Sequence, residues 1–337
     1  MVKKIAKKDQ LHIGILDYTE LKYGSKSNKE IRELRRAIKD RGHKPIHYKV
    51  GKCQMFFSGK NFEILYNNKS TKGVDVLVPR AAILSDVDLE VSLIKQFQLL
   101  DVPVINGYLP VLRAKNKLRT MQILTKKGIS VPKTVVTRKL EYLDDAIKKI
   151  GGYPCIIKTC TGSYGAGVVI VESRRSLYSA LDALWVNSKS NIIMIQEYVA
   201  EATGADYRAF VIGDKVVAAM KRQAQPGEFR SNLELGGEAS IADLSLEEQK
   251  VAVKATKALG LQIGGVDMLL TSKGPMIMEV NANPGFKGIS DASGIDIAME
   301  IVKYTEKFMK AHAEKSIKNG KSVKKPSLSK SSKKAAK

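Results

Sequence analysis

Three residues in the last third of the chain have side chains suited to bind a divalent metal ion. Asp267, Glu279 and Asn281 lie close together in the stretch GGVDMLLTSKGPMIMEVNANPG. Carboxylate and amide oxygens are the ligands that hard cations such as Mg2+ prefer. Three such groups within 15 residues predict a metal site, provided that the chain brings them to one face.

A β-hairpin would bring them together. Apolar runs flank the segment Ser272-Lys273-Gly274, and Gly274 can supply the positive φ that a three-residue loop needs. If Thr271 pairs with Pro275, Asp267 lies opposite Glu279, and the alternation of side chains puts both on one face. A two-residue turn would put Asp267 on the wrong face. The alternative is a core hairpin whose acidic residues point to solvent.

A lysine and a glycine loop could bind phosphate groups. Lys158 ends an apolar run and precedes the loop Thr161-Gly162-Ser163-Tyr164-Gly165-Ala166-Gly167. This loop is neither a Walker A sequence nor a dinucleotide-binding fingerprint. Because glycine loops are common between strands, the loop alone is weak support. A lysine beside it is nevertheless a point charge suited to the α and β phosphates of a nucleotide.

Other polar residues could complete a nucleotide site. Residues 195–199 end a strand, so their backbone could contact an adenine edge, while Glu197 or Asp206 could bind ribose hydroxyls. Taken singly, each acid is equally compatible with an ordinary surface carboxylate. Arg222, Arg230 and Asn232 lie in or beside a glycine-rich span that could cover a cleft, although a solvated charged loop is the simpler reading.

The elements that must position these residues alternate between strands and helices. Periodicity predicts a parallel α/β lobe, then a basic helical connector over 109–127, then a unit of mixed strands and helices. Predicted strands cover 11–16, 45–50, 74–79, 102–106, 131–137, 154–159, 167–172, 192–197, 207–212, 215–219, 263–270 and 275–280. Predicted helices cover 29–41, 86–100, 176–185, 246–259 and 296–310.

Composition narrows the class of protein. With 337 residues, 44% of them hydrophobic, the chain suits two or three packed lobes, and no apolar run approaches the ~18 residues of a membrane span. Three cysteines without paired metal spacing favour a reducing compartment, so a cytoplasmic location is expected. Residues 311–337 carry +8 and residues 1–10 carry +3, which leaves +12 for the body. A basic body suits acidic partners or an RNA-rich particle, or simply aids solubility.

The order of the motifs resembles the RimK group of α-L-glutamate ligases in the ATP-grasp superfamily. In chain order these motifs are Lys117, Lys158 with its glycine loop, Glu197-Tyr198, Asp206-Tyr207-Arg208, Phe229-Arg230-Ser231-Asn232, Gly265-Val266-Asp267 and Met278-Glu279-Val280-Asn281-Ala282-Asn283-Pro284-Gly285. The first lobe also echoes that group in Arg41-Gly42-His43, Pro79-Arg80, Gln96-Phe97 and 113–118. The metal set and the Phe-Arg-Ser-Asn segment are the specific signals.

The resemblance implies a mixed α/β and α+β fold, with an N-terminal parallel α/β (pre-ATP-grasp) domain before a two-lobed ATP-grasp fold. The expected divisions are a basic N-terminal arm, the α/β domain, a helical connector, the central lobe, the C-terminal lobe and a disordered basic tail, at 1–10, 11–107, 108–130, 131–200, 201–310 and 311–337.

The resemblance also implies roles for individual residues. It implies Mg2+, or Mn2+, as two ions on Asp267, Glu279 and Asn281. Within the implied mechanism we expect Arg230, with Arg222 as a substitute, to stabilise an acylphosphate. The resemblance implies ATP contacts from Lys117, Lys158, Glu197, Tyr198, Asp206, Arg230, Ser231 and Asn232.

The implied activity is an ATP-dependent carboxylate–amine ligation through an acylphosphate. The leading expectation is addition of L-glutamate to the C-terminus of an acidic or carboxylate-terminated acceptor, namely the sixth small-subunit ribosomal protein. Alternatives are addition of an amino acid to a carrier protein, coenzyme or small peptide, or a ribosome- or RNA-binding protein without ligase activity. The basic tail could contact the ribosome, and the resemblance makes a homotetramer or dimer the expected state.

Overall fold

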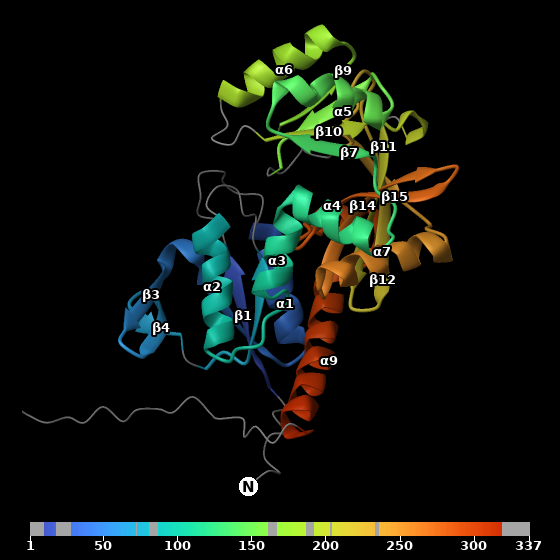
Figure 1. The fold of residues 1–337 in the computed structure, drawn as a ribbon. Helices are drawn as coiled ribbons and strands as arrows, with labels where there is room; N and C mark the ends of the chain where they lie inside the picture. The colour runs from blue at the N-terminus through green and yellow to red at the C-terminus, as the bar shows by residue number, and fades with distance from the viewer. Residues whose placement is uncertain are drawn as a thin grey trace, which may run out of the picture.

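The computed structural model describes residues 10–17, 28–71, 73–80, 87–160, 167–186, 192–202, 204–232 and 236–318. The N-terminal domain contains a parallel sheet in the order β2-β1-β6, formed by Lys44–Lys49, His12–Asp17 and Val76–Arg80. Helices α1 (Asn28–Asp40) and α2 (Val87–Leu99) belong to this domain (Figure 1). The predicted parallel α/β lobe is confirmed, and the expected strand at 102–106 is reduced to a bridge from Val104 to Leu77.

A second, antiparallel sheet in this domain was not predicted. It consists of β3 (Cys53–Ser58), β4 (Asn61–Tyr66) and β5 (Lys69–Ser70). The turn from β4 to β5 contains Asn67 and Asn68, both at positive φ. Adjacent asparagines tolerate that backbone conformation and favour tight hairpin turns, so the sequence did carry a signal for this sheet.

The helical connector consists of two helices instead of one. Helix α3 (Tyr108–Lys115) ends before Asn116, and α4 (Lys117–Lys126) begins directly after it. The Asn116 side chain accepts a hydrogen bond from the backbone N–H of Arg119 and so caps α4. A side-chain cap of this kind satisfies an N–H at the start of a helix, and it makes Asn116 a boundary that apolar periodicity alone does not reveal.

The central lobe is built on a four-stranded antiparallel sheet in the order β7-β10-β8-β9. These strands are Thr134–Thr137, Ile193–Glu197, Cys155–Lys158 and Val168–Val171. Helices α5 (Leu143–Ile150) and α6 (Arg174–Val186) pack with the sheet around a core that includes Leu177 and Ile195. In Figure 1 this lobe is the green and yellow part at the top.

The C-terminal lobe contains a five-stranded antiparallel sheet in the order β13-β12-β11-β14-β15. The strands are Glu238–Ile241, Lys215–Gln223, Ala205–Ile212, Ile263–Thr271 and Gly274–Asn281. Helix α7 (Leu246–Leu259) packs on one face through Ala252 and Ala255, against residues such as Val266 and Val280. On the other face, Phe210 and its neighbours pack with α8 (Lys287–Ser293) and α9 (Ile297–Lys318).

Helix α9 extends further than expected. It continues to Lys318, so the boundary of the basic tail at 310 was placed too early; residues 319–337 lie outside the described part of the chain. The Phe308 and His312 rings stack at 6.3 Å, and Lys315 and Lys318 lie in the last turn, where cations favour the helix dipole. None of the described helices is long and apolar enough to cross a membrane, and all three cysteines are free thiols.

Candidate active site in the C-terminal sheet

The β14–β15 hairpin has a two-residue turn. Thr271 pairs with Gly274, whose φ is +100°, so the predicted three-residue loop is wrong. A regular hairpin on this turn would have put Glu279 on the wrong face. A β-bulge at Met278 adds one residue to β15 and brings Glu279 back opposite Asp267. The predicted pairing of the two carboxylates is therefore present, although it arises from the bulge instead of the loop.

Asp267 is buried among charged partners. Arg208 donates to both of its carboxylate oxygens at 2.6 Å, and Arg222 lies 3.1 Å from Oδ2. Burial alone would favour the neutral acid, but the two guanidinium groups hold the pKa of Asp267 at about 2. Arg222 also donates to both oxygens of Asp206, at 2.6 and 2.5 Å. The four residues form one network of alternating charge.

This network contains two residues with predicted roles, Asp206 and Arg222. Asp206 is buried and bonded to Arg222, so in this structure its carboxylate faces a guanidinium instead of open space for a ribose. The Arg222 side chain is only 4% exposed and lies between the carboxylates of Asp206 and Asp267. In the sequence, Arg208 was only part of a motif, and no role was predicted for it. Its contact with Asp267 depends on the register of β11 with β14, which a single sequence does not reveal.

Glu279 and Asn281 lie next to Asp267 on the same sheet. The Lys117 Nζ lies 3.3 Å from Oε1 of Glu279, and the Asn281 amide nitrogen lies 3.5 Å from Oδ2 of Asp267. Two carboxylates and an amide fit a hard divalent cation by donor type. Among the described residues, no group of three or more His, Cys, Asp and Glu side chains is placed to hold a metal ion, so a metal here relies on the amide and on release of Asp267 from arginine.

Lys158 ends β8 with a buried ammonium group. Its Nζ donates to the Gln196 side-chain oxygen at 2.8 Å, and the Gln196 amide donates onward to the Thr134 hydroxyl at 2.8 Å. Burial, assisted by the nearby charge of Lys117, lowers the pKa of Lys158 to about 8, while Glu279 opposes this shift. The pKa of Lys158 thus depends on charged groups from two other segments of the chain.

The other residues predicted to contact ATP lie apart from the Asp267 network. Glu197 accepts a hydrogen bond from the Lys133 backbone at 2.7 Å, and Tyr198 directly follows β10. Arg230 pairs with Glu228 at 2.8 and 3.0 Å and is not brought into contact with the Asp267 network. Ser231 is buried, and the Asn232 carbonyl accepts from Gly237. Most of the predicted glycine loop, residues 161–166, lies outside the described residues.

Sequence reasoning missed the contacts that attach the hairpin to the N-terminal domain. The Asn106 amide donates to the carbonyls of Ile263 and Ala282 at 2.7 and 2.6 Å, and its oxygen accepts from the backbone of Gln262 and Ile263. Arg80 donates to the Pro284 carbonyl at 2.6 Å. The start of β14 and the segment after β15 are therefore fixed to another domain.

The pre-ATP-grasp domain, the central lobe and the C-terminal sheet with paired carboxylates define an ATP-grasp ligase. The RimK-like ATP-grasp domain family matches residues 114–305, and the RimK pre-ATP-grasp domain family matches residues 11–108. The chain belongs to the RimK-like ATP-grasp family. That family uses ATP together with divalent metal ions.

Curated relatives share about two residues in five with this chain. One from Photobacterium profundum, named probable alpha-L-glutamate ligase, is 42% identical over 298 residues, which cover 88% of this chain and 96% of the relative. Another from Shewanella frigidimarina, named probable alpha-L-glutamate ligase 1, is 40% identical over 305 residues and covers 90% and 98% of the two chains.

Solved structures share the fold at lower identity. The ATP-grasp ligase PsnB complexed with a minimal precursor has a TM-score of 0.66 at 18% identity, covering 86% of this chain and 97% of that one. D-alanine–D-alanine ligase from Bacillus anthracis complexed with ATP has a TM-score of 0.65 at 18% identity, covering 90% and 99%.

Proposed function

We propose that this ligase joins the amine of L-glutamate to the terminal carboxylate of a protein acceptor. The observation that carries the proposal is the opposition of Asp267 and Glu279 in the β14–β15 hairpin, with Lys117 at 3.3 Å from Glu279. Anionic and cationic groups side by side suit a metal-bound triphosphate. The names of the curated relatives support glutamate as the added amino acid.

The proposed reaction has two steps. An oxygen of the acceptor carboxylate attacks the γ-phosphorus of ATP, the bond to the β–γ bridging oxygen breaks, and ADP leaves. The glutamate nitrogen then attacks the acyl carbon, phosphate leaves with the bonding electrons, and the amine loses a proton. Such transfers depend mainly on alignment and on charge neutralisation, so no nucleophilic side chain is required.

The chain's own residues have separate tasks in this scheme. Lys117 and Lys158 neutralise the phosphates that do not react, and Glu197, Tyr198, Ser231 and Asn232 orient the nucleotide. Asp267, Glu279 and Asn281 would hold two Mg2+ or Mn2+ ions, which would neutralise charge on the phosphate oxygens. Arg230 is the candidate for stabilising the acylphosphate. To bind it, Arg230 must first release the Glu228 carboxylate. Arg222 and Asp206 position Asp267.

The charge of the chain indicates the kind of acceptor. The body of the chain carries +12, which suits an acidic acceptor whose charge grows with each glutamate. We propose the C-terminus of the sixth small-subunit ribosomal protein, with a carrier protein, a coenzyme or a small peptide as alternatives. We further propose a cytoplasmic homo-oligomer.

The test combines purified protein, ATP, Mg2+, L-glutamate and each candidate acceptor. Release of ADP and acceptor masses raised by whole glutamyl residues are expected with the true acceptor. Omission of each component in turn shows whether ADP release is coupled to amide formation. Absence of ADP with every combination of amino acid and acceptor, in protein that binds ATP, contradicts ligase activity.

A truncation tests whether the basic tail helps the enzyme to reach the ribosome. Because α9 ends at Lys318, deletion of residues 319–337 leaves every described element intact. We expect this variant to modify free acceptor protein at the parent rate and ribosome-bound acceptor more slowly. Equal losses on both acceptors, or none, contradict a docking role.

A further inference from the structure

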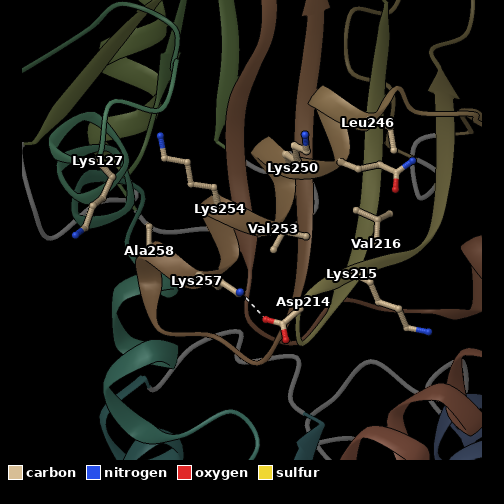
Figure 2. Close-up of a pocket in the computed structure, with 11 residues that line it drawn as sticks. Lys127, Asp214, Lys215, Val216, Leu246, Lys250, Val253, Lys254, Lys257 and Ala258 are labelled. Atoms are coloured by element: carbon tan, nitrogen blue, oxygen red, sulfur yellow. Dashed lines mark ion pairs between the residues drawn. The ribbon is translucent and has the colours of Figure 1, made fainter.

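A lysine-lined pocket lies on the α7 side of the C-terminal sheet. It has a volume of about 590 Å3 and is formed by α7, β12, the turn before β12 and the end of α4 (Figure 2). This volume falls within the range of ordinary ligand pockets, about 300–1,000 Å3. The lining residues are Lys127, Asp214, Lys215, Val216, Leu246, Gln249, Lys250, Val253, Lys254, Lys257 and Ala258.

The pocket is separate from the candidate active site. Helix α7 packs on the sheet face that carries Val266 and Val280, whereas Asp267 and Glu279 alternate with these residues and point to the opposite face. No residue of the candidate active site lines the pocket. The pocket therefore is a second surface, on the far side of the sheet.

The pocket is strongly cationic. Five of its eleven lining residues are lysines, and Asp214 is its single acid. Asp214 is bonded to Lys257 at 2.5 Å, and Lys215 pairs with Glu300 at 3.1 Å. Within the described part of the chain, no ion pair involves Lys127, Lys250 or Lys254. In Figure 2, Lys250 and Lys254 project from α7 away from the Lys257–Asp214 pair.

Apolar side chains lie between the lysines. Val216, Val253 and Ala258 are half-buried, and the Leu246 side chain at the start of α7 is 75% exposed. The lining contains no aromatic residue and no arginine. Nucleic-acid-binding surfaces commonly use aromatic stacking and the bidentate arginine fork. A lining without either favours a polypeptide with carboxylates as the ligand over RNA.

We infer that this pocket binds an acidic peptide segment in which carboxylates alternate with apolar side chains. The lysines attract the carboxylates of the peptide, and the apolar side chains between the lysines contact its aliphatic groups. This inference goes beyond the proposed ligase activity. Because the pocket lies behind the sheet, such a segment is held at a distance from the reacting carboxylate.

The test is direct binding, measured on the full chain without ATP or glutamate. A fluorescein-labelled peptide Glu-Leu-Glu-Glu-Leu-Glu is titrated by fluorescence anisotropy, in parallel with Glu-Ser-Glu-Glu-Ser-Glu and an RNA oligomer of equal charge. We expect the leucine peptide to bind most tightly. The double variant Lys250→Glu/Lys254→Glu should weaken its binding about tenfold or more, since two attractions become repulsions.

Two matched variants make the test specific. Lys148→Glu/Lys149→Glu makes the same change of charge on exposed lysines of α5 and should alter the dissociation constant by less than about twofold. Leu246→Ser should weaken binding of the leucine peptide about threefold and leave the serine peptide unchanged. Equal effects of the two double variants, or tighter RNA binding that the pocket variant abolishes, overturn the inference. Because ligase activity is not measured, neither outcome bears on the proposed reaction.

Discussion

Arg208 donates to both carboxylate oxygens of Asp267, at 2.6 Å each. Asp267 is also the most buried of the proposed metal ligands. A cation that binds this carboxylate must therefore compete with a bidentate guanidinium, which is one of the stronger side-chain interactions. The affinity for metal is thus linked to the position of Arg208.

The first prediction concerns Arg208→Met. Removal of the competing guanidinium should tighten Mn2+ binding in the absence of nucleotide several-fold, because Asp267 then retains only Arg222. Electron paramagnetic resonance of free Mn2+ measures this affinity directly. Arg41→Met, which removes a bidentate arginine from Glu306 on α9, is the matched control and should leave Mn2+ affinity unchanged. Weaker binding in Arg208→Met would show that the arginine assists the metal site.

The second prediction concerns Glu279→Gln. The amide keeps the size of the side chain and removes its charge, so the hairpin should fold while metal-dependent ADP release falls about 100-fold or more. Glu238→Gln, at an exposed position of β13 in the same sheet, should retain parent activity. Full activity of Glu279→Gln at low Mg2+ concentration would remove Glu279 from the metal site.

The third prediction concerns the cost of the buried Lys158 charge. Its pKa in the folded protein, about 8, lies below that of an unfolded lysine. At pH 7 both states are protonated, and the folded state bears the desolvation cost. Lys158→Met removes this cost but leaves the buried Gln196 side-chain oxygen without its donor. The free energy of unfolding at pH 7 should therefore rise by only about 1–2 kcal/mol, while ATP binding is impaired.

The stability difference between Lys158→Met and the parent should depend on pH. Above pH 8 the folded parent releases the proton while the unfolded chain keeps it, so the parent gains stability as pH rises. The advantage of Lys158→Met should shrink steadily between pH 8 and about 10. Urea unfolding at several pH values measures it, with exposed Lys148→Met as the control. A constant difference across this range would contradict a lowered pKa.

The fourth prediction concerns Asn106→Ala. Four hydrogen bonds to the backbone of the C-terminal lobe are lost, and buried peptide groups remain without a partner. Because each such group costs about 1–3 kcal/mol, we expect unfolding to become easier by about 3 kcal/mol or more. Urea denaturation followed by circular dichroism provides the measurement. Asn61→Ala, at the exposed first residue of β4, should change stability by less than about 0.5 kcal/mol.

The sequence predicted elements and residue types well because apolar periodicity and oxygen ligands are local properties. The alternation of β1, α1 and β2, the four-stranded lobe and the opposition of Asp267 to Glu279 were all anticipated. The bulge at Met278 was not, since a bulge depends on the pairing of two strands. The Asn116 cap, which divides the connector, was a local signal that the broader periodicity obscured.

Contacts between distant segments account for most of what was missed. Arg208 reaches Asp267 across 59 positions, and Asn106 reaches Ala282 across 176. Neither partner is indicated by spacing, because the register of β11 with β14 and the docking of two domains decide both. For the same reason, Arg222 seemed available for catalysis in the sequence, whereas its guanidinium is held between two carboxylates.

The bulge at Met278 makes the hairpin sensitive to its number of residues. Substitutions along β15 change one side chain at a time. A single insertion or deletion between Thr271 and Glu279 instead moves the acid to the α7 side of the sheet or forces a new bulge to form. Engineered libraries of this segment should therefore vary its residues at constant length, and loss of function from a one-residue change in length does not identify any individual side chain as essential.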